Sequence, residues 1–560
     1  MIPSDPTPFC CPPPPATAAL VNAFRADRDL VLRRWDVPAS QDRGAALRDL
    51  YALWQGRLAG LPPTDHADEA LDRILLERYL ERQQEQLCRE EARWAETTDW
   101  LPGAGLLMFL QTQLRVVVRP NARDAAAVLA ELTPKLEAAR VRLQESIQDR
   151  GAAFGAVARR VLAGLDDMVE VSHRWSTHYS AYDPQFDWWV SVPHREFHAA
   201  LTAYREAAAA AVAAAQEGLV VGDPLGREAL QAEIHGEGLP YTPEELLAIA
   251  EAEYAWCEAE MLRAAAEMGL PGDWRGALER VKAAHPEPGE QPGLVAELAA
   301  EAVEFLDQHD LVTVPALARI GWRLEMMTEE EQKINPFFLG GEVIKVSYPT
   351  SRMSHREKLM SLRGNNRHFS RTTVQHELIP GHFLQSYMME RNQPHRCLFS
   401  TPFWIEGWAL HWEMLLWELE FPRSPEDRVG MLFWRMHRCV RITFSLGFHL
   451  GELSPRECVE LLVGRVGHER ANAEGEVRRS FGGGYPPLYQ AAYLLGGLQF
   501  HTLYRECTGA GGLSPREFHD RVLQSGPMPM PCLRAHLLGL PLTRENLDGW
   551  RFAEPSAGGA

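Results

Sequence analysis

The sequence lacks an uninterrupted apolar stretch of the ~20 residues that a membrane-spanning helix requires. Its first residues, MIPSDPTPFCCPPPPATAAL, have neither the basic start nor the apolar core of a secretory signal peptide. No apolar stretch precedes Cys10 and Cys11, as a lipoprotein signal would require. We therefore expect a cytoplasmic protein with no membrane partner. The abundance of proline predicts that residues 1–18 form a flexible tail.

The sequence also has fewer basic than acidic residues, and its cysteines follow no recognisable spacing. The chain has 57 Lys and Arg residues against 76 Asp and Glu residues, a net charge of −19. Because binding to phosphates needs a basic face, this balance argues against nucleic acid as the main partner. The nine cysteines form no C-x-x-C pair. An odd, unpatterned set of this kind is typical of free thiols in a reducing compartment.

Strand-forming patterns are rare, and helical patterns dominate. Apolar residues recur at helical spacing in DEALDRILLERYLERQQEQ. Three helix starts carry a capping residue, proline and glutamate in sequence: Thr242-Pro243-x-Glu245, Ser454-Pro455-x-Glu457 and Ser514-Pro515-x-Glu517. Strand signal is confined to FFLGGEVIKVSYPT (337–350) and, more weakly, to LVTVPAL (311–317), where Pro315 suggests an edge strand. The sequence predicts a mainly α fold with a small β-hairpin or edge sheet.

The segment RTTVQHELIPGHFLQSYMMERN (371–392) contains candidate metal ligands. Zinc peptidases carry H-E-x-x-H, with the two histidines four residues apart on one helical face. Here His376 and His382 are six residues apart, and on an ideal helix they would point ~120° away from each other. Pro380 clashes with the carbonyl of residue 376, and Gly381 adds backbone freedom. The helix is therefore expected to bulge or break, which would allow either a metal site or two structural histidines.

A third candidate ligand lies in TPFWIEGWALHWEMLLWE (401–418). Catalytic zinc keeps three protein ligands and one open position, and a helix that turns back after residue 392 could present Glu406 to the two histidines. Glu413 is seven residues further along and shares the face of Glu406. The alternative is a Trp-rich core helix. A carboxylate between Ile405 and Gly407 fits that alternative poorly, because burying an unpaired charge is costly.

The motifs H-E-x-x-P-G-H and E-G-W-A-L-x-x-E resemble those of a bacterial family catalogued as domain of unknown function 885 (DUF885), which is similar in architecture to all-α zinc peptidases such as angiotensin-converting enzyme and the oligopeptidases. The resemblance implies one helical body with a central cleft, formed by an N-terminal helical part (19–305) and a catalytic part (306–555). It also implies one zinc ion per chain, held by His376, His382 and Glu406, with Glu377 as the general base.

Two later segments match the family in part. RITFSLGFH keeps Arg441, Gly447 and His449, but Ser445 stands in place of the family's acid. RRSFGGGYPPLYQAAYLLG keeps Arg479, Pro487, Tyr493 and Gly496, whereas Ser480, Leu488 and Tyr489 depart from the pattern. These departures indicate a divergent member, with a substrate pocket that differs from the family's.

These residues lead to the hypothesis of a zinc-dependent peptidase that acts on short peptides. Tyr493 or His449 would stabilise the oxyanion. Arg441 and Arg479 would hold a substrate carboxylate, unless they form internal salt bridges. An edge strand ending at Tyr348 would pair with an extended peptide, and Glu413 would orient a metal ligand. The alternatives are a metal-dependent amidohydrolase acting on a non-peptide amide and a helical binding protein without catalysis.

Overall fold

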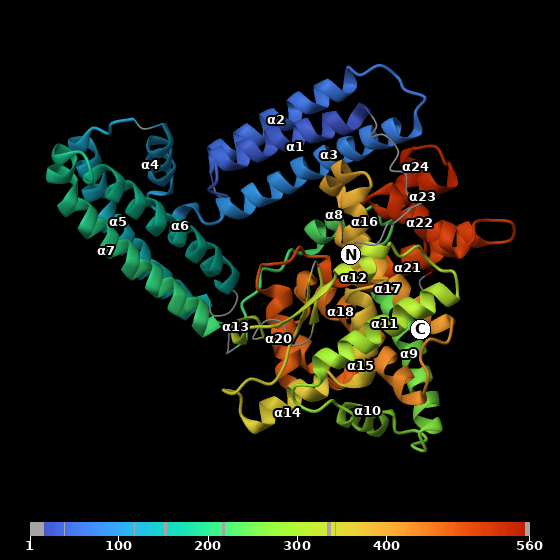
Figure 1. The fold of residues 1–560 in the computed structure, drawn as a ribbon. Coiled ribbons are helices and arrows are strands. Elements are labelled where there is room, and N and C mark those ends of the chain that lie inside the picture. The colour runs from blue at the N-terminus through green and yellow to red at the C-terminus, as the bar shows by residue number, and fades with distance from the viewer. Residues whose placement is uncertain are drawn as a thin grey trace. The chain divides into compact units, whose positions relative to one another are not determined.

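The computed structural model describes residues 16–38, 40–116, 118–150, 154–215, 219–332, 338–341 and 343–554. The fold is mainly α, as predicted (Figure 1). Most of the predicted tail, residues 1–15, lies outside the described ranges, and residues 16–18 already belong to α1 (Ala16–Arg34). Within those ranges, no helix combines the length and the apolar character needed to cross a membrane.

The chain divides into two compact units. The first unit contains residues 1–22, 62–78 and 224–560, and the second contains residues 23–61 and 79–223. The predicted junction between residues 305 and 306 falls inside the first unit, within α11 (Gln291–Gln308). All of the predicted site residues belong to the first unit.

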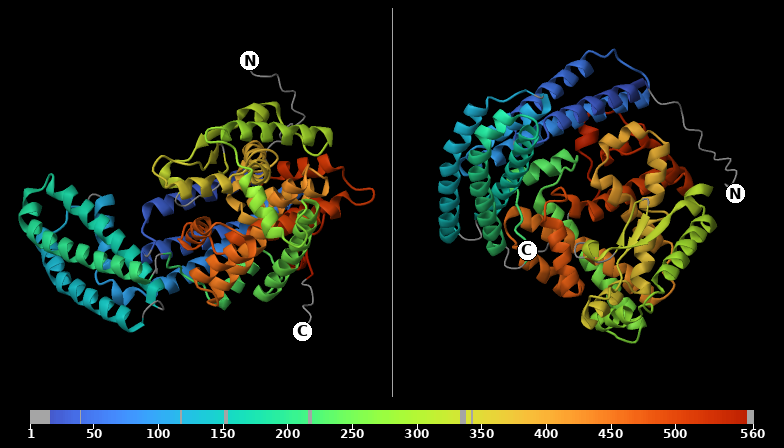
Figure 2. Two further views of the ribbon diagram at one scale, coloured as in Figure 1. Left: turned by 90° about the horizontal axis from the view of Figure 1, so that it is seen from below. Right: turned by 60° about the vertical axis from the view of Figure 1, so that its left-hand side comes forward.

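The second unit is built from long helices that pack lengthwise, as α5 and α7 do in Figures 1 and 2. Its core is aromatic and aliphatic, with Trp175, Tyr179, Phe186 and Leu201 completely buried. Its helices, of which α1 and α3 begin in the first unit, are α1, α2 (Gln41–Ala59), α3 (Ala67–Ala95), η1 (Thr98–Trp100), α4 (Ala104–Val116), α5 (Ala122–Arg150), α6 (Gly155–Ser180) and α7 (Pro184–Ala215).

The first unit packs its remaining helices around α17 and α18. Helix α17 contacts α15, α16 and α21, while α18 contacts α9, α15 and α21. The helices are α8 (Arg227–Gly236), α9 (Pro243–Glu267), α10 (Trp274–Ala283), α11, α12 (Ala316–Gly321), α13 (Glu329–Gln332), α14 (His355–Gly364), α15 (Arg367–Glu377), α16 (His382–Arg391), η3 (Pro394–Phe399), α17 (Pro402–Glu418), α18 (Pro425–Leu450), α19 (Pro455–Leu461), η4 (Leu462–Val466), α20 (Arg470–Phe481), α21 (Tyr489–Thr508), α22 (Pro515–Ser525), α23 (Met530–Leu538) and α24 (Arg544–Asp548).

The three predicted helix starts are confirmed. Thr242, Ser454 and Ser514 each accept a hydrogen bond from the backbone N–H three residues on, and the glutamate at that position bonds back to the capping residue. This reciprocal pair satisfies two backbone donors that the first helical turn leaves without partners. Local sequence therefore determines where α9, α19 and α22 begin.

The β-element predicted at 337–350 is confirmed by the strands β2 and β3, although residues 337 and 342 lie outside the described ranges. A three-stranded sheet runs in the order β1 (Arg323–Met326), β3 (Val343–Val346), β2 (Phe338–Leu339). Strand β2 pairs antiparallel with β3, placing Phe338 opposite Val346, and β1 pairs parallel with β3, placing Arg323 opposite Val343.

Two strand predictions are wrong. Residues 311–317 form no strand, because Pro315 precedes the first turn of α12, where a missing N–H costs little. The strand before Tyr348 is not an edge: β3 ends at Val346, and β1 covers its other side. The edge beside the site is instead β2, since Phe338 and Gly340 line the cavity described below.

Helices α17 and α21 approach closely because glycines face each other at the crossing. A Cβ atom on Gly407 would lie only 2.6 Å from the carbonyl carbon of Gly496, and one on Gly496 only 2.6 Å from the carbonyl oxygen of Phe403. Trp404 and Trp408 on α17 are completely buried. The contact fixes how closely α17 packs against α21. It therefore also fixes the position of Glu406, which immediately precedes Gly407.

We expect Gly496→Ala to lower the free energy of unfolding by about 1–3 kcal/mol, because its methyl group would force two helix backbones apart. Chemical denaturation followed by circular dichroism measures the change. Gly464→Ala is the matched control, since a Cβ there meets nothing within 4 Å. Equal stability of the Gly496→Ala variant and the unmodified protein would contradict the close packing.

Candidate metal centre

The helix breaks between the two histidines, as the sequence predicted. Helix α15 ends at Glu377, and α16 begins at His382. The four intervening residues form a tight turn in which a side chain on Gly381 would collide with the carbonyl oxygen of His376. The imidazole rings of His376 and His382 come to 4.7 Å between centroids and lie nearly perpendicular. The turn thus removes the ~120° divergence that an unbroken helix would impose.

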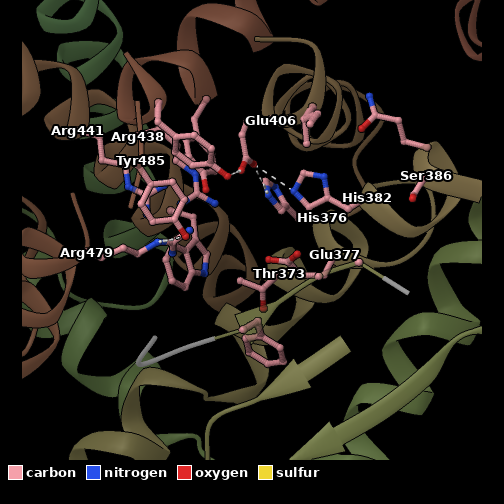
Figure 3. A pocket seen from close by; sticks show the side chains of 18 of the residues that line it. Thr373, His376, Glu377, His382, Ser386, Glu406, Arg438, Arg441, Arg479 and Tyr485 are labelled. Atoms are coloured by element: carbon pink, nitrogen blue, oxygen red, sulfur yellow. Dashed lines mark hydrogen bonds and ion pairs between the residues drawn. The ribbon is translucent and has the colours of Figure 1, made fainter. Parts of the chain in front are cut away.

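Glu406 reaches both histidines from α17 (Figure 3). Its Oε2 atom lies 3.1 Å from Nε2 of His382 and 3.5 Å from Nε2 of His376. Ligand atoms around a tetrahedral zinc ion lie ~3.3 Å from one another, because Zn–N and Zn–O bonds are ~2.1 Å long. The three side chains therefore have the spacing and the donor types of a zinc site. In the described ranges this is the one such cluster of His, Cys, Asp or Glu.

Neighbouring side chains hold these three in place. Oε1 of Glu413 lies 2.7 Å from Nδ1 of His376, which leaves Nε2 directed at Glu406. Metal-binding histidines commonly donate their second N–H to a carboxylate in this way. The hydroxyl of Tyr489 donates to Oε1 of Glu406. Because Oε1 is occupied, Glu406 offers only Oε2 to the histidines.

The charges of the cluster depend on one another. Burial alone would raise the pKa of Glu406, but the imidazoles of His382 and His376 hold it well below its usual range. Burial likewise favours neutral Glu413, yet Arg438 and His376 lower the pKa of that carboxyl. Burial lowers the pKa of His376, but hydrogen bonds to Glu406 and Glu413 outweigh this effect and raise it to about 9. In the metal-free protein the cluster therefore holds a buried proton.

The cluster opens onto a cavity of about 300 Å³. Glu377 lines it beside the histidines and is half-buried. Gly340, which follows β2, approaches so closely that any side chain there would collide with the Glu377 carboxylate. The apolar part of the cavity wall consists of Phe338, Met389, Ile405 and Trp434.

The opposite wall consists of arginines and tyrosines (Figure 3). Nη2 of Arg441 lies 2.7 Å from Glu476, and Nε of Arg479 donates to the Tyr485 hydroxyl at 3.0 Å. The Tyr493 ring lies between this wall and the cluster. Its centroid is 4.3 Å from the Arg441 guanidinium carbon and 6.1 Å from the centroid of the His376 ring.

The structure gathers most of the predicted site residues in one place. The cavity is lined by the predicted ligands and by Glu377, Arg441, Arg479 and Tyr493. Glu413 lies behind His376, as its predicted supporting role requires. Tyr348 and His449 are not among the described residues that line the cavity. His449 lies in the last turn of α18, where its carbonyl accepts a hydrogen bond from Gly226.

Among the cavity residues that were not predicted are three that extend the polar wall: Arg438, Tyr485 and Tyr489. Arg438 could have been found, because it precedes Arg441 by three residues on the same helical face. Tyr489 was recognised only as a departure from the family pattern. Its bond to Glu406 joins residues 83 positions apart, and no local signal reports such a contact.

We expect the purified protein to contain about one zinc ion per chain and His382→Ala to lose it, because a site with three protein ligands keeps little affinity once one of them is removed. Elemental mass spectrometry of both proteins measures this. His309→Ala, at an exposed position, is the control and should retain the metal. Equal zinc content in the His382→Ala variant would contradict the assignment.

Metal binding should release a proton. With a pKa of about 9, His376 is protonated at pH 7 in the metal-free protein, and a metal ligand must be neutral. The apparent zinc affinity should therefore rise with pH up to about 9 and level off above it. Isothermal titration at pH 7, in buffers of different ionisation enthalpy, should show about one proton released per zinc. Binding without proton release would contradict the described hydrogen bonds of His376.

Comparison with known proteins places the chain by family and by fold. A comparison with curated proteins found no match. One similar solved structure is that of a candidate lipoprotein of unknown function from Shewanella oneidensis, with a TM-score of 0.66, 16% identity, and coverage of 93% of this chain and 100% of that one. Another is a candidate lipoprotein from Colwellia psychrerythraea, with a TM-score of 0.57, 14% identity, and coverage of 93% and 98%. At these identities the likeness concerns the fold alone.

The family comparison covers nearly the whole chain. Residues 16–537 match the model of the bacterial proteins of unknown function DUF885. This range includes both histidines, Glu406 and the arginine and tyrosine wall. The chain belongs to the DUF885 family.

Proposed function

We propose that the protein is a zinc-dependent hydrolase that cleaves peptide bonds in short peptides. The observation that carries the proposal is the position of Glu377. It follows the ligand His376 directly, lines the same cavity as the three-residue cluster, and forms no hydrogen bond with another described side chain. A cluster built only to stabilise the fold would need neither an open cavity nor a free carboxylate beside it.

The donor set fits a catalytic metal ion. Two imidazoles and one carboxylate are a ligand set found in zinc peptidases, whereas structural zinc sites are closed by four ligands. Bound there, the ion would polarise a substrate carbonyl and lower the pKa of a water molecule. His376, His382 and Glu406 would hold it, and Glu413 would keep Nε2 of His376 directed toward it.

Glu377 serves as the general base in this proposal. Its carboxylate takes a proton from the attacking water as the water oxygen bonds to the carbonyl carbon. The C–N bond of the amide then breaks, and the proton passes from Glu377 to the leaving nitrogen. The products are a carboxylic acid and an amine, and Glu377 returns to its ionised form.

Tyr493 would donate a hydrogen bond to the oxyanion of the tetrahedral intermediate. Burial, reinforced by Glu406, raises the pKa of its hydroxyl, so it stays protonated and able to donate at neutral pH. Its ring lies between His376 and Arg441. The Tyr489 hydroxyl already donates to Glu406, so of these two tyrosines Tyr493 is the one proposed as the oxyanion donor.

The size of the cavity favours short peptides. A volume of about 300 Å³ admits a few residues of an extended chain and excludes a folded domain. The same chemistry would act on a non-peptide amide, and a binding protein without catalysis would have the same cavity. Hydrolysis of a peptide library separates these three cases.

The site of action is proposed to be a reducing compartment such as the cytoplasm. The cysteines of the described ranges are free thiols, most of them buried, and reducing compartments maintain this state. The two similar structures described as candidate lipoproteins would favour a location outside the cytoplasmic membrane. Fractionation of cells that express the protein distinguishes these locations.

Replacing Glu377 with glutamine should reduce peptide hydrolysis by about 10²–10⁴-fold, because glutamine cannot accept the proton. Zinc content should stay unchanged, since Glu377 is not a ligand. Turnover and metal content are measured on the same preparations, with the exposed Glu390→Gln on α16 as control. Full activity of Glu377→Gln would refute the assigned base. Failure of the zinc-loaded, unmodified protein to cleave any library peptide would favour the binding protein.

A further inference from the structure

Three guanidinium groups converge on one end of the cavity. Arg438, Arg441 and Arg479 all line it, and they are called the arginine wall below (Figure 3). Arg438 and Arg441 come from α18, one helical turn apart, and Arg479 comes from α20. Three guanidinium groups thus lie near the candidate metal centre, in a chain whose net charge is −19.

The protein does not neutralise the arginine wall completely. Arg441 pairs with Glu476 at 2.7 Å, and Arg438 lies 3.5 Å from Glu413, a carboxylate that His376 shares. Arg479 forms no ion pair with a described carboxylate, and its Nε bonds to the neutral Tyr485 hydroxyl. Among the described residues, one positive charge of the arginine wall therefore has no ion-pair partner.

Buried N–H groups of the arginine wall also lack acceptors. Among the described residues, neither Nη1 of Arg441 nor Nε of Arg438 has a hydrogen-bond partner, although both atoms are shielded from solvent. Arg441 is only 3% exposed. An unsatisfied donor of this kind costs free energy. A bound anion would satisfy such donors, and the planar guanidinium matches a carboxylate with two parallel hydrogen bonds.

The arginine wall lies one tyrosine ring away from the metal centre. Tyr493 separates Arg441 from His376, with 4.3 Å on one side and 6.1 Å on the other. A second route runs from Arg479 through Tyr485 to Tyr489, whose rings are 4.4 Å apart, and on to Glu406. In a bound peptide, a group held at the arginine wall would therefore be only a short distance along the peptide from a bond positioned at the metal centre.

We infer that the arginine wall binds the free C-terminal carboxylate of a peptide, with Arg479 as its principal cation. This inference rests on the proposed hydrolase function and specifies it: the enzyme would be a carboxypeptidase that cleaves close to the C-terminus. An acidic side chain near the end of a peptide offers the same carboxylate chemistry. The short distance to the metal centre favours the terminal carboxylate, and the experiment below separates the two sources.

The test measures binding apart from catalysis. The zinc-loaded Glu377→Gln protein is titrated calorimetrically with trileucine, with trileucine amide, and with the amide of leucyl-leucyl-glutamate. Trileucine should bind at least about tenfold more tightly than either amide, because a hydrogen-bonded charge pair contributes at least that factor. Adding Arg479→Gln should remove the difference, and Arg479→Lys should restore part of it.

Arg478→Gln is the matched control. Arg478 precedes Arg479 on α20, lies outside the cavity lining, and pairs with Glu474. The tenfold preference should survive this substitution, and zinc content and circular dichroism should be the same for all variants.

Three results would overturn the inference: equal binding of acid and amide, absence of binding by trileucine, or a preference that Arg479→Gln leaves intact. Equal binding of trileucine and the glutamate-containing amide would assign the arginine wall to side-chain carboxylates instead. The hydrolase proposal fails separately. If trileucine binds preferentially but the unmodified protein does not cleave it, the carboxylate subsite stands and the hydrolase proposal is wrong. If the acid and the amide are cleaved equally, the hydrolase proposal stands and the carboxylate subsite is wrong.

Discussion

Burying the ionised carboxylate of Glu406 costs free energy that only direct partners can offset. Its two oxygens divide those partners: Oε2 faces His376 and His382, and Oε1 accepts from Tyr489. Each partner comes from a different element, so α15, α16 and α21 must all be in place before Glu406 can be buried on α17. The broken turn at Gly381 and the glycine crossing of α17 with α21 are the backbone arrangements that satisfy this requirement.

The residues around the cluster also carry buried charges that need partners of opposite sign. Glu413 supports His376 and is itself approached by Arg438, while Arg441 is paired with Glu476. Buried charges therefore occur in alternating sign from the metal centre to the arginine wall. In networks of this kind the members strengthen one another, so that losing one weakens the rest. Two of the positions at which the sequence was expected to depart from the family pattern make such contacts. The serine at position 445 bonds to the carbonyl of Pro487, and Tyr489 is used to hold Glu406.

Much of the local structure could be predicted from the sequence, because its causes are local. The capping residues at Thr242, Ser454 and Ser514 mark helix starts correctly, and Pro380 with Gly381 predicts a break in the helix. The identity of β1 and the central position of β3 could not be predicted. Strand pairing depends on contacts between distant segments, and a four-residue strand carries little periodic signal.

In the candidate site, too, some features could be predicted from local sequence and others depend on contacts between distant segments. Residue types and motif order identified His376, His382 and Glu406, but spacing on an ideal helix argued against the first two, and only the turn geometry brings them together. Tyr489 was missed because its importance lies in a partner far away in the sequence, whereas Arg438 was missed although it shares a helical face with Arg441. Tyr348 and His449, selected by position in a pattern, lie away from the cavity lining.

The most direct test of the zinc assignment is anomalous diffraction from crystals of the zinc-loaded protein, recorded on both sides of the zinc absorption edge. We expect one anomalous peak per chain, at bonding distance from Nε2 of His376, Nε2 of His382 and Oε2 of Glu406. A peak at other residues, or none in crystals soaked with zinc, would show that the buried Glu406 holds two histidines and no metal.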